Sequence, residues 1–382
     1  MKFVLFYHSV VSCWNHGNAH FLRGICRELL RLGHEVHLYE PEDGWSRMNA
    51  LQDGGAQVLR EAESLVPGLA IHRYALSTLD LDAALDGADV VIVHEWNAPE
   101  LVARLGERRA QGGAFTLLFH DTHHRGVSAP EEIARFAIEA YDGVLVFGEV
   151  LREVYLANGW AREVFTWHEA ADTALFRPLA DRPKDVDLVW IGNWGDGERA
   201  AELGEFLLEP VSRLNMKARI HGVRYPEEIR AELAARNIDY AGWLPNHAAP
   251  EAFARACVTV HIPRRPYVEA LPGIPTIRVF EALACGIPLV SAPWRDSEGL
   301  FPAGCYLSAN TGAEMSAALL LLRNDTALRD ELVCNGLAAI EARHSCAHRV
   351  EGLLTLLATL RGRAWAAAKR QKIGTTRMEL AS

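Results

Sequence analysis

The chain has 382 residues with a net charge of −10, and 49% of the residues are hydrophobic. A single hydrophobic core rarely extends beyond about 250–300 residues, so this length predicts two domains. The acidic charge argues against a general nucleic-acid-binding protein, since such proteins are usually basic. The 7 cysteines include no C-x-x-C pair, which indicates reduced thiols and a cytoplasmic location. No stretch approaches the ~20 apolar residues of a membrane span.

The first half of the chain alternates short apolar strands with helical segments. The N-terminal string MKFVLFYHSVV is expected to hold the first core strand, over 2–7, rather than a signal peptide. Further strands are predicted over 35–39, 71–74, 90–94, 115–119 and 143–147, and helices over 18–32, 99–110, 130–140 and 149–157. Such alternation is typical of a parallel sheet that is covered on both faces.

A second alternating series follows residues 164–178, which are predicted to link two domains. Its strands are expected over 187–191, 218–221, 258–262 and 287–292, and its helices over 226–237, 249–256 and 277–284. Helices over 313–323 and 327–342 and one from 347 follow. The pattern predicts an N-terminal domain over 1–170, a C-terminal domain over 171–345, and a helix with a basic tail over 346–382 that could pack back on the first domain.

The most informative stretch is ALPGIPTIRVFEALACGIPLVSAP, residues 270–293. Thr276 is suited to cap a helix that begins at residue 277, and Gly286 is suited to the position after its end. A helix N-terminus that follows a glycine-containing loop is a ready anion site. Glu281 lies among apolar residues, where a carboxylate needs a partner or a ligand.

Several strings in the chain resemble GT-B glycosyltransferases, especially family 4. FEALACGIP at 280–288 resembles the family's C-terminal signature, and with Arg278 ahead of it looks most like the CgeB-like spore-maturation branch. LLRLGHEVHLY, VFTWHEAADTALFRP and LRNDTALRDELVCNG resemble the opening βαβ unit, the domain link and the closing helices. The resemblance implies an α/β GT-B fold, with two Rossmann-like, doubly wound parallel-sheet domains facing across a cleft. It also implies that Glu281 holds the ribose hydroxyls of a nucleotide-sugar in the C-terminal domain.

The glycine loop IGNWGDGER at 191–199 resembles the family's loop for the donor diphosphate. Asn193 and Glu198 stand where many members carry Arg and Lys, so Arg199 is the best candidate for bidentate phosphate binding. Gly273 replaces the first Glu of the family's Glu-x7-Glu pattern, and its loop could use backbone N–H groups instead. Gly17 opens the first helix and could serve either as a phosphate loop or as a simple turn. The predicted donor-binding residues are Gly17, Gly192, Asn193, Arg199, Gly273, Ile274, Thr276, Arg278 and Glu281.

Open α/β sheets bind ligands beyond the carboxyl ends of their strands. This rule places His16, His94 and Glu95 on the acceptor side, together with the strand end His120-Asp121, which resembles a strand end near the reacting sugar in the family. We predict His120, Asp121 and Arg199 as catalytic residues, with His120 facing the cleft. His120 could instead be a structural histidine. His123 and His124 extend this group, but it lacks the helical spacing of a zinc site, so no metal is predicted.

The resulting prediction is a metal-independent hexosyltransferase without a cofactor. It would move a sugar from a nucleotide-sugar to a hydroxyl of a glycan, lipid-linked sugar, small molecule or protein, and family 4 resemblance implies retention of anomeric configuration. A nucleotide-sugar epimerase on the same fold, or a non-catalytic nucleotide- or sugar-binding assembly protein, remain alternatives. No nucleic-acid partner is expected. The basic tail over 361–382 could contact an anionic membrane, although we favour a solvated, frayed end.

Overall fold

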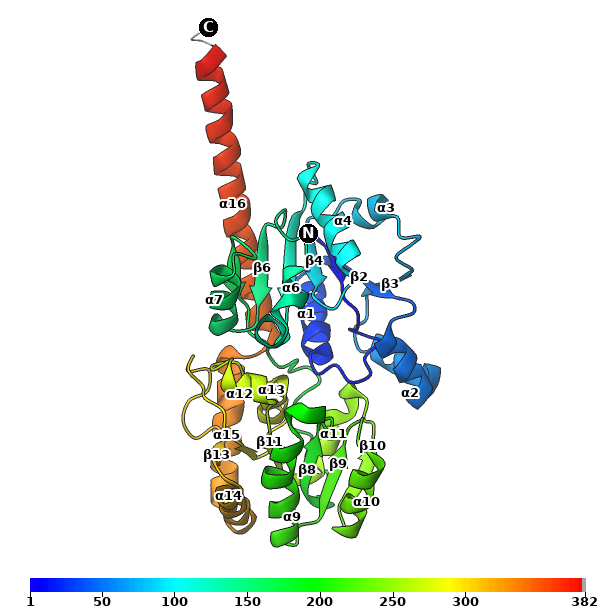
Figure 1. The fold of residues 1–382 in the computed structure, drawn as a ribbon, viewed down its shortest axis with the longest axis vertical. Coiled ribbons are helices and arrows are strands. Elements are labelled where there is room, and N and C mark those ends of the chain that lie inside the picture. The colour runs from blue at the N-terminus through cyan, green and yellow to red at the C-terminus, as the bar shows by residue number, and fades with distance from the viewer. Residues whose placement is uncertain (380–382) are drawn as a thin grey trace.

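The computed structural model describes residues 1–379, and for Asp196 and residues 363–379 it describes the backbone alone. Two domains, each built on a parallel sheet, lie one above the other in Figure 1. This confirms the predicted two-domain α/β architecture. Within the described residues, no helix combines the length and the apolar character that crossing a membrane requires.

The N-terminal domain has a seven-stranded, entirely parallel sheet in the order β3-β2-β1-β4-β5-β6-β7. Its strands are β1 (Lys2–Phe6), β2 (Glu35–Pro41), β3 (Ala70–Tyr74), β4 (Val90–His94), β5 (Thr116–Asp121), β6 (Gly143–Val146) and β7 (Val164–Thr166). Its helices are α1 (Ala19–Arg31), α2 (Trp45–Ser64), α3 (Leu81–Leu85), α4 (Pro99–Ala110), α5 (Arg125–Ser128), α6 (Pro130–Ala134) and α7 (Glu149–Ala157). The strand order reverses between β1 and β4, so the loops after these strands diverge and leave a crevice.

The C-terminal domain repeats this plan with six parallel strands in the order β10-β9-β8-β11-β12-β13. Its strands are β8 (Val186–Ile191), β9 (Ala218–His221), β10 (Asp239–Gly242), β11 (Ala256–His261), β12 (Leu289–Ser291) and β13 (Leu307–Ser308). Its helices are η1 (Asp196–Glu198), α8 (Ala200–Leu203), η2 (Gly204–Leu208), α9 (Glu209–Arg213), α10 (Glu227–Ala235), η3 (Asn246–Ala248), α11 (Ala249–Ala254), α12 (Arg265–Glu269), α13 (Ile277–Ala284), α14 (Gly312–Asn324) and α15 (Thr326–Arg343). Here the order reverses between β8 and β11, which places a second crevice opposite the first.

The last helix, α16 (Cys346–Glu379), returns to the N-terminal domain and packs on α1. In Figure 1 it runs from the junction of the domains along the upper domain and beyond it. Val350 and Leu353 join the core that contains Phe21 and Ile25. Arg349 donates hydrogen bonds to the carbonyl groups of the domain link, including that of Glu169 at 3.1 Å, and so ties this segment to α16. The basic side chains from residue 363 onward lie outside the described side chains.

Four local expectations differ from the structure. β7 lies within the segment predicted as the link, so the connection begins after Thr166. β5 continues through Asp121, two residues beyond the predicted end, because its backbone stays paired with β6. The helix predicted over 130–140 ends at Ala134. α2 was not predicted, since a Gly-Gly pair interrupts its pattern and Gly55 has a left-handed φ of 65° that kinks the helix.

Candidate active site

A cavity of about 620 Å³ lies between the domains, where the carboxyl ends of both sheets face each other. Parallel sheets bring the loops after their strands to this edge, which explains why residues far apart in sequence meet there. From the N-terminal domain and the link the lining includes His8, residues 13–18, Trp45, Trp96, residues 122–124, Phe147 and Glu169. From the C-terminal domain it includes residues 190–193, Arg199, Gly222, Arg224, Trp243, Leu244, Asn246, Ala249, His261, Ile262, Arg264, Tyr267 and residues 276–278.

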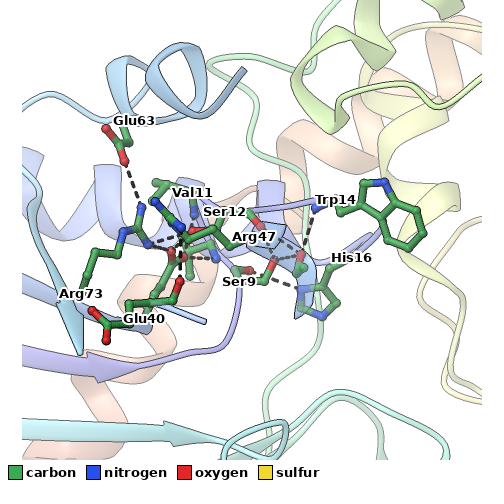
Figure 2. A network of polar contacts seen from close by, with 12 residues as sticks. Ser9, Val11, Ser12, Trp14, His16, Glu40, Arg47, Glu63 and Arg73 are labelled. Atoms are coloured by element: carbon green, nitrogen blue, oxygen red, sulfur yellow. Dashed lines mark hydrogen bonds and ion pairs between the residues drawn. The ribbon is translucent and has the colours of Figure 1, made fainter. Parts of the chain in front are cut away.

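The loop after β1 is held in place by a buried carboxylate on the next strand. Glu40, which is 0% exposed, accepts hydrogen bonds from the backbone N–H groups of Val10 and Val11 at 2.5 and 2.9 Å. It also accepts from the Ser12 hydroxyl and pairs with Arg73. Figure 2 shows Glu40 and Arg73 beneath the loop that ends at His16. A carboxylate with this many donors stabilises one loop conformation, and thereby fixes the N-terminal wall of the cavity.

His8 is an imidazole of this wall whose two ring nitrogens both lack hydrogen-bond partners among the described residues. It is 5% exposed and lines the cavity. It stacks between Trp45 and His94, with centroids 5.9 and 5.5 Å away. Burial, and next the neighbouring His16, hold the pKa of His8 well below its ordinary value. A neutral imidazole with free nitrogens can accept a proton from, or bind, an acceptor hydroxyl. The sequence analysis did not single out His8, although it lies two residues beyond the end of β1.

The predicted acceptor-side residues divide between the cavity and the core. His16 lines the cavity, and burial lowers its pKa to about 4. His94 is fully buried and is hydrogen-bonded to the Thr122 hydroxyl at 2.9 Å. Glu95 is buried and pairs with Arg125, so it is part of a structural ion pair rather than of the wall.

His120 does not face the cleft, and that part of the prediction is wrong. Because β5 extends through Asp121, the His120 side chain is 0% exposed and packs beside Trp167 at a centroid distance of 4.9 Å. Its Nδ1 lies 2.7 Å from the Tyr7 hydroxyl. Asp121 is equally buried and accepts a hydrogen bond from the Tyr155 hydroxyl at 2.7 Å, while burial raises its pKa to about 6. Neither residue lines the cavity.

The buried state of His120 predicts a pH dependence of stability. Burial lowers its pKa to about 3, so between pH 6.5 and pH 3 the unfolded chain binds a proton that the folded chain excludes. Stability is therefore full above pH 6.5 and falls as the pH decreases. In His120→Gln, the loss of stability between pH 7 and pH 5 should be about 2 kcal/mol smaller than in the parent. Urea denaturation at both pH values measures this, and equal losses would contradict a neutral, buried His120.

Arg199 lies on the C-terminal wall, close to the predicted glycine loop. Its side chain is buried, at 8% exposure, and donates to the carbonyl oxygens of Asn193 and Ile262 at 2.5 and 3.2 Å. It forms no ion pair with a carboxylate that the structure describes, and burial lowers its pKa to about 10. Gly192 and Asn193 line the same wall. Arg199 is thus a cation at neutral pH that the protein leaves open to an anionic ligand.

The N-terminus of α13 borders this cation. Thr276 occupies the predicted N-cap position, but its hydroxyl makes no capping hydrogen bond. Its carbonyl oxygen accepts from the Val279 N–H group, so the N–H groups of Ile277 and Arg278 are the ones available to an anion. Arg278 lines the cavity beside it. Arg264 also lines the cavity and pairs with Glu198 at 2.6 Å. This end of the cavity therefore brings together three guanidinium groups, of which Arg199 is the one without a carboxylate partner among the described residues.

Glu281 lies one layer behind this wall. It is 0% exposed and pairs with Arg278, with His20 Nδ1 at 3.0 Å, and with the Asn246 side-chain amide at 3.1 Å. Burial opposes its ionisation, yet Arg278 and His20 hold its pKa below the ordinary value. The carboxylate thus has the partners that were expected for a charged group among apolar residues. Arg278 and Asn246 line the cavity, whereas Glu281 does not.

Gly273 and Ile274, predicted to bind the donor, do not line the cavity. Gly273 has a left-handed φ of 91° and packs on Glu298, where a Cβ atom would lie 2.7 Å from the glutamate Cγ. Ile274 is fully buried against Gly148, and so holds the domains together. Gly17 does line the cavity, and a Cβ atom there would lie 2.7 Å from Ile277 Cγ2. Its small size permits the close approach of the first-domain loop to α13.

Within the described part of the chain, the cavity has no cluster of side chains suited to a metal ion. Among the described residues, no group of three His, Cys, Asp or Glu side chains could hold a metal ion. Glu169 is the one acidic residue among the described residues that line the cavity. The chain also contains two Asp-x-Asp strings, at residues 80–82 and 185–187, and neither lines the cavity. Asp80 caps α3, and Asp187 accepts a hydrogen bond from the Lys217 backbone N–H group.

Solved structures resemble the chain over almost its full length. Sucrose-phosphate synthase from Thermosynechococcus elongatus matches with a TM-score of 0.66 and 15% identity, covering 95% of this chain and 100% of the other. HepE from Anabaena, in complex with UDP, matches with a TM-score of 0.63 and 12% identity, covering 94% and 100%. The β-glucosyltransferase of phage T4 matches with a TM-score of 0.62 and 14% identity, covering 94% and 99%. The chain has the GT-B fold.

The sequence match is confined to the second half of the chain. Residues 199–355 match the family model described as glycosyl transferase-like. The matched segment begins at Arg199 and includes α13. No curated protein matches the chain in sequence. Within the GT-B fold, the positive wall belongs to the C-terminal domain and the histidine-rich wall to the N-terminal domain.

Proposed function

We propose that the chain is a glycosyltransferase that transfers a hexose from a nucleoside diphosphate sugar to an acceptor hydroxyl. The observation that carries this proposal is Arg199, a buried guanidinium without a carboxylate partner among the described side chains, which faces the interdomain cavity next to α13. An uncompensated buried cation is costly, and a diphosphate would offset this cost. The similar solved structures add support, since HepE is complexed with UDP and phage T4 β-glucosyltransferase with UDP-glucose.

The proposed roles follow from the charges of the two walls. Arg199, Arg278 and the N-terminus of α13 would hold the donor diphosphate and stabilise it as the leaving group. His8 and His16 would contact the acceptor hydroxyl. His120 and Asp121, which do not line the cavity, would support this wall from behind. The acceptor, whether a glycan, lipid-linked sugar, small molecule or protein, stays a prediction, as do membrane contact through the tail and a cytoplasmic location.

We further propose retention of anomeric configuration without a metal ion, as in family 4 and its CgeB-like branch. In this mechanism a phosphate oxygen of the donor takes the acceptor proton on the face from which the diphosphate leaves. The metal-independent part of this mechanism is supported by the guanidinium groups of Arg199 and Arg278, which line the cavity and would neutralise the leaving diphosphate in place of a metal ion. NMR of the first-formed product shows its anomeric configuration. An inverted configuration would contradict this mechanism and would make His8 the base that takes the acceptor proton.

The test begins with binding and then adds acceptors. Thermal stabilisation should identify one nucleoside diphosphate among UDP, GDP, ADP, CDP and dTDP, because a ligand at 100 times its Kd stabilises by ~2.7 kcal/mol. The corresponding sugar donor should release that diphosphate in an acceptor-dependent manner. EDTA should leave the rate unchanged, and loss of activity that Mn²⁺ or Mg²⁺ restores would contradict the metal-independent mechanism. Donor turnover without an acceptor, giving an isomerised sugar, would indicate an epimerase.

A further inference from the structure

Glu169 is a buried carboxyl group that lines the cavity and has no part in the proposed contacts with the donor or the acceptor. It lies on the link between the domains, is 3% exposed, and its Oε1 atom has no hydrogen-bond partner among the described residues. The Glu169 carboxyl group as a whole has one side-chain hydrogen-bond partner, Asn18. No Lys, Arg or His side chain among those described forms an ion pair with it. The link itself is fixed, because Arg349 donates to the Glu169 carbonyl oxygen at 3.1 Å.

This environment disfavours an ionised carboxylate. Removing an unpaired carboxylate from water is costly, and the nearby Glu281 carboxylate adds repulsion. Glu281 has engaged its own cations, His20 and Arg278, and therefore leaves none for Glu169. Tyr267, the titratable group facing it from α12, is itself kept neutral by burial, which raises its pKa. Burial, and next Glu281, raise the pKa of Glu169 well above its ordinary value.

We propose that Glu169 is a neutral carboxylic acid that donates its O–H group to a phosphate oxygen of the bound nucleoside diphosphate. This role rests on the proposed function, because it requires a bound nucleoside diphosphate. It adds to the donor site a group that carries a proton. Glu169 faces the same cavity as Arg199 and the N-terminus of α13, where an anion is expected. An ionised carboxylate at this position would repel a diphosphate, whereas a neutral acid forms a short, charge-assisted hydrogen bond with it. Diphosphate binding is therefore linked to one proton.

Titration of nucleotide binding tests this linkage. The Kd of UDP, and in parallel of GDP and ADP, is measured by calorimetry at pH 7, 8 and 9, where the ligand phosphates are already ionised. The cavity histidines His8, His16, His123, His124 and His261 have pKa values lowered by burial and stay neutral in this range. We expect the affinity of the parent protein to fall as the pH rises through the pKa of Glu169, by up to tenfold per pH unit.

Two substitutions separate the proton from the hydrogen bond. Glu169→Gln keeps a neutral donor of the same size, so its affinity at pH 7 should stay within about threefold of the parent while the pH dependence disappears. Glu169→Ala removes the donor and should lose on the order of tenfold or more in affinity at pH 7. Glu298→Gln is the matched control, because Glu298 contacts the link through His168 at 2.6 Å but does not line the cavity. It should retain the pH profile of the parent.

The outcomes distinguish this inference from the proposed function. Parallel pH profiles for the parent and Glu169→Gln would overturn the role of Glu169 while leaving diphosphate binding intact. Glu169→Gln could also keep the affinity and the pH dependence of the parent but lose turnover. That result would overturn the hydrogen bond to the diphosphate and would show that Glu169 donates a proton in the reaction. If none of the diphosphates binds the parent protein, both proposals fail. Melting temperatures at each pH exclude unfolding as the cause of a lost affinity.

Discussion

Replacing Arg199 with methionine is expected to lower turnover by about 10²–10³-fold and to leave the protein folded. The guanidinium is buried, lines the cavity and forms no ion pair with a described carboxylate, so its charge is directed at a ligand rather than at the fold. Methionine keeps most of the side-chain volume over Trp190, whose ring lies 5.2 Å from the guanidinium carbon. The affinity for nucleoside diphosphate should fall with turnover, because the charge acts on bound and leaving diphosphate alike.

The stability of the same variant provides the more selective measurement. Removing a buried cation that has no carboxylate partner relieves a desolvation cost, so the melting temperature should stay equal or rise. Arg265→Met is the matched control, because Arg265 pairs with Glu202 at 2.6 Å and does not line the cavity. It should retain both affinity and turnover. A destabilised Arg199→Met with normal nucleotide affinity would show that Arg199 holds the loops of Asn193 and Ile262 and does not bind the donor.

Glu281→Ala is expected to destabilise the protein by ~3–5 kcal/mol. The carboxylate is fully buried and joins α13 to two distant segments through His20 and Asn246. Without it, Arg278 loses its partner in a half-buried position and would carry an uncompensated charge. Because a typical domain is stable by about 5–15 kcal/mol, this loss should be visible as a large shift of the urea midpoint.

A double substitution identifies the cause of this loss. If the unpaired arginine is responsible, Glu281→Ala combined with Arg278→Met should recover part of the stability, and a double-mutant cycle gives the coupling energy. Glu269→Ala is the surface control, since Glu269 is exposed, and should change stability by no more than about 0.5 kcal/mol. Unchanged stability in Glu281→Ala with a hundredfold loss of nucleotide affinity would instead support the ribose contact that the family resemblance implied.

The sequence by itself determined the two parallel sheets and the edge at which a ligand would bind. Short, continuously apolar runs such as residues 2–6 can be buried on both faces, and their alternation with helices requires parallel strands. The carboxyl ends of such strands necessarily share an edge, so the glycine loop at Gly192 and Asn193 and the loop at His16 could be placed at the cavity from local pattern. Arg199 was selected through the resemblance of its loop to a family's diphosphate loop.

Only the tertiary structure decided which side chains at that edge reach the cavity. The strand-end rule does not specify how far neighbouring strands stay paired, and pairing of β5 with β6 through Asp121 draws His120 and Asp121 into the core. Glu281 was recognisable as a carboxylate in need of partners, but His20 and Asn246 lie far from it in sequence, and no local period encodes such contacts. Glu169 gained its importance in the same way, because the link on which it lies becomes a cavity wall only when the two domains face each other.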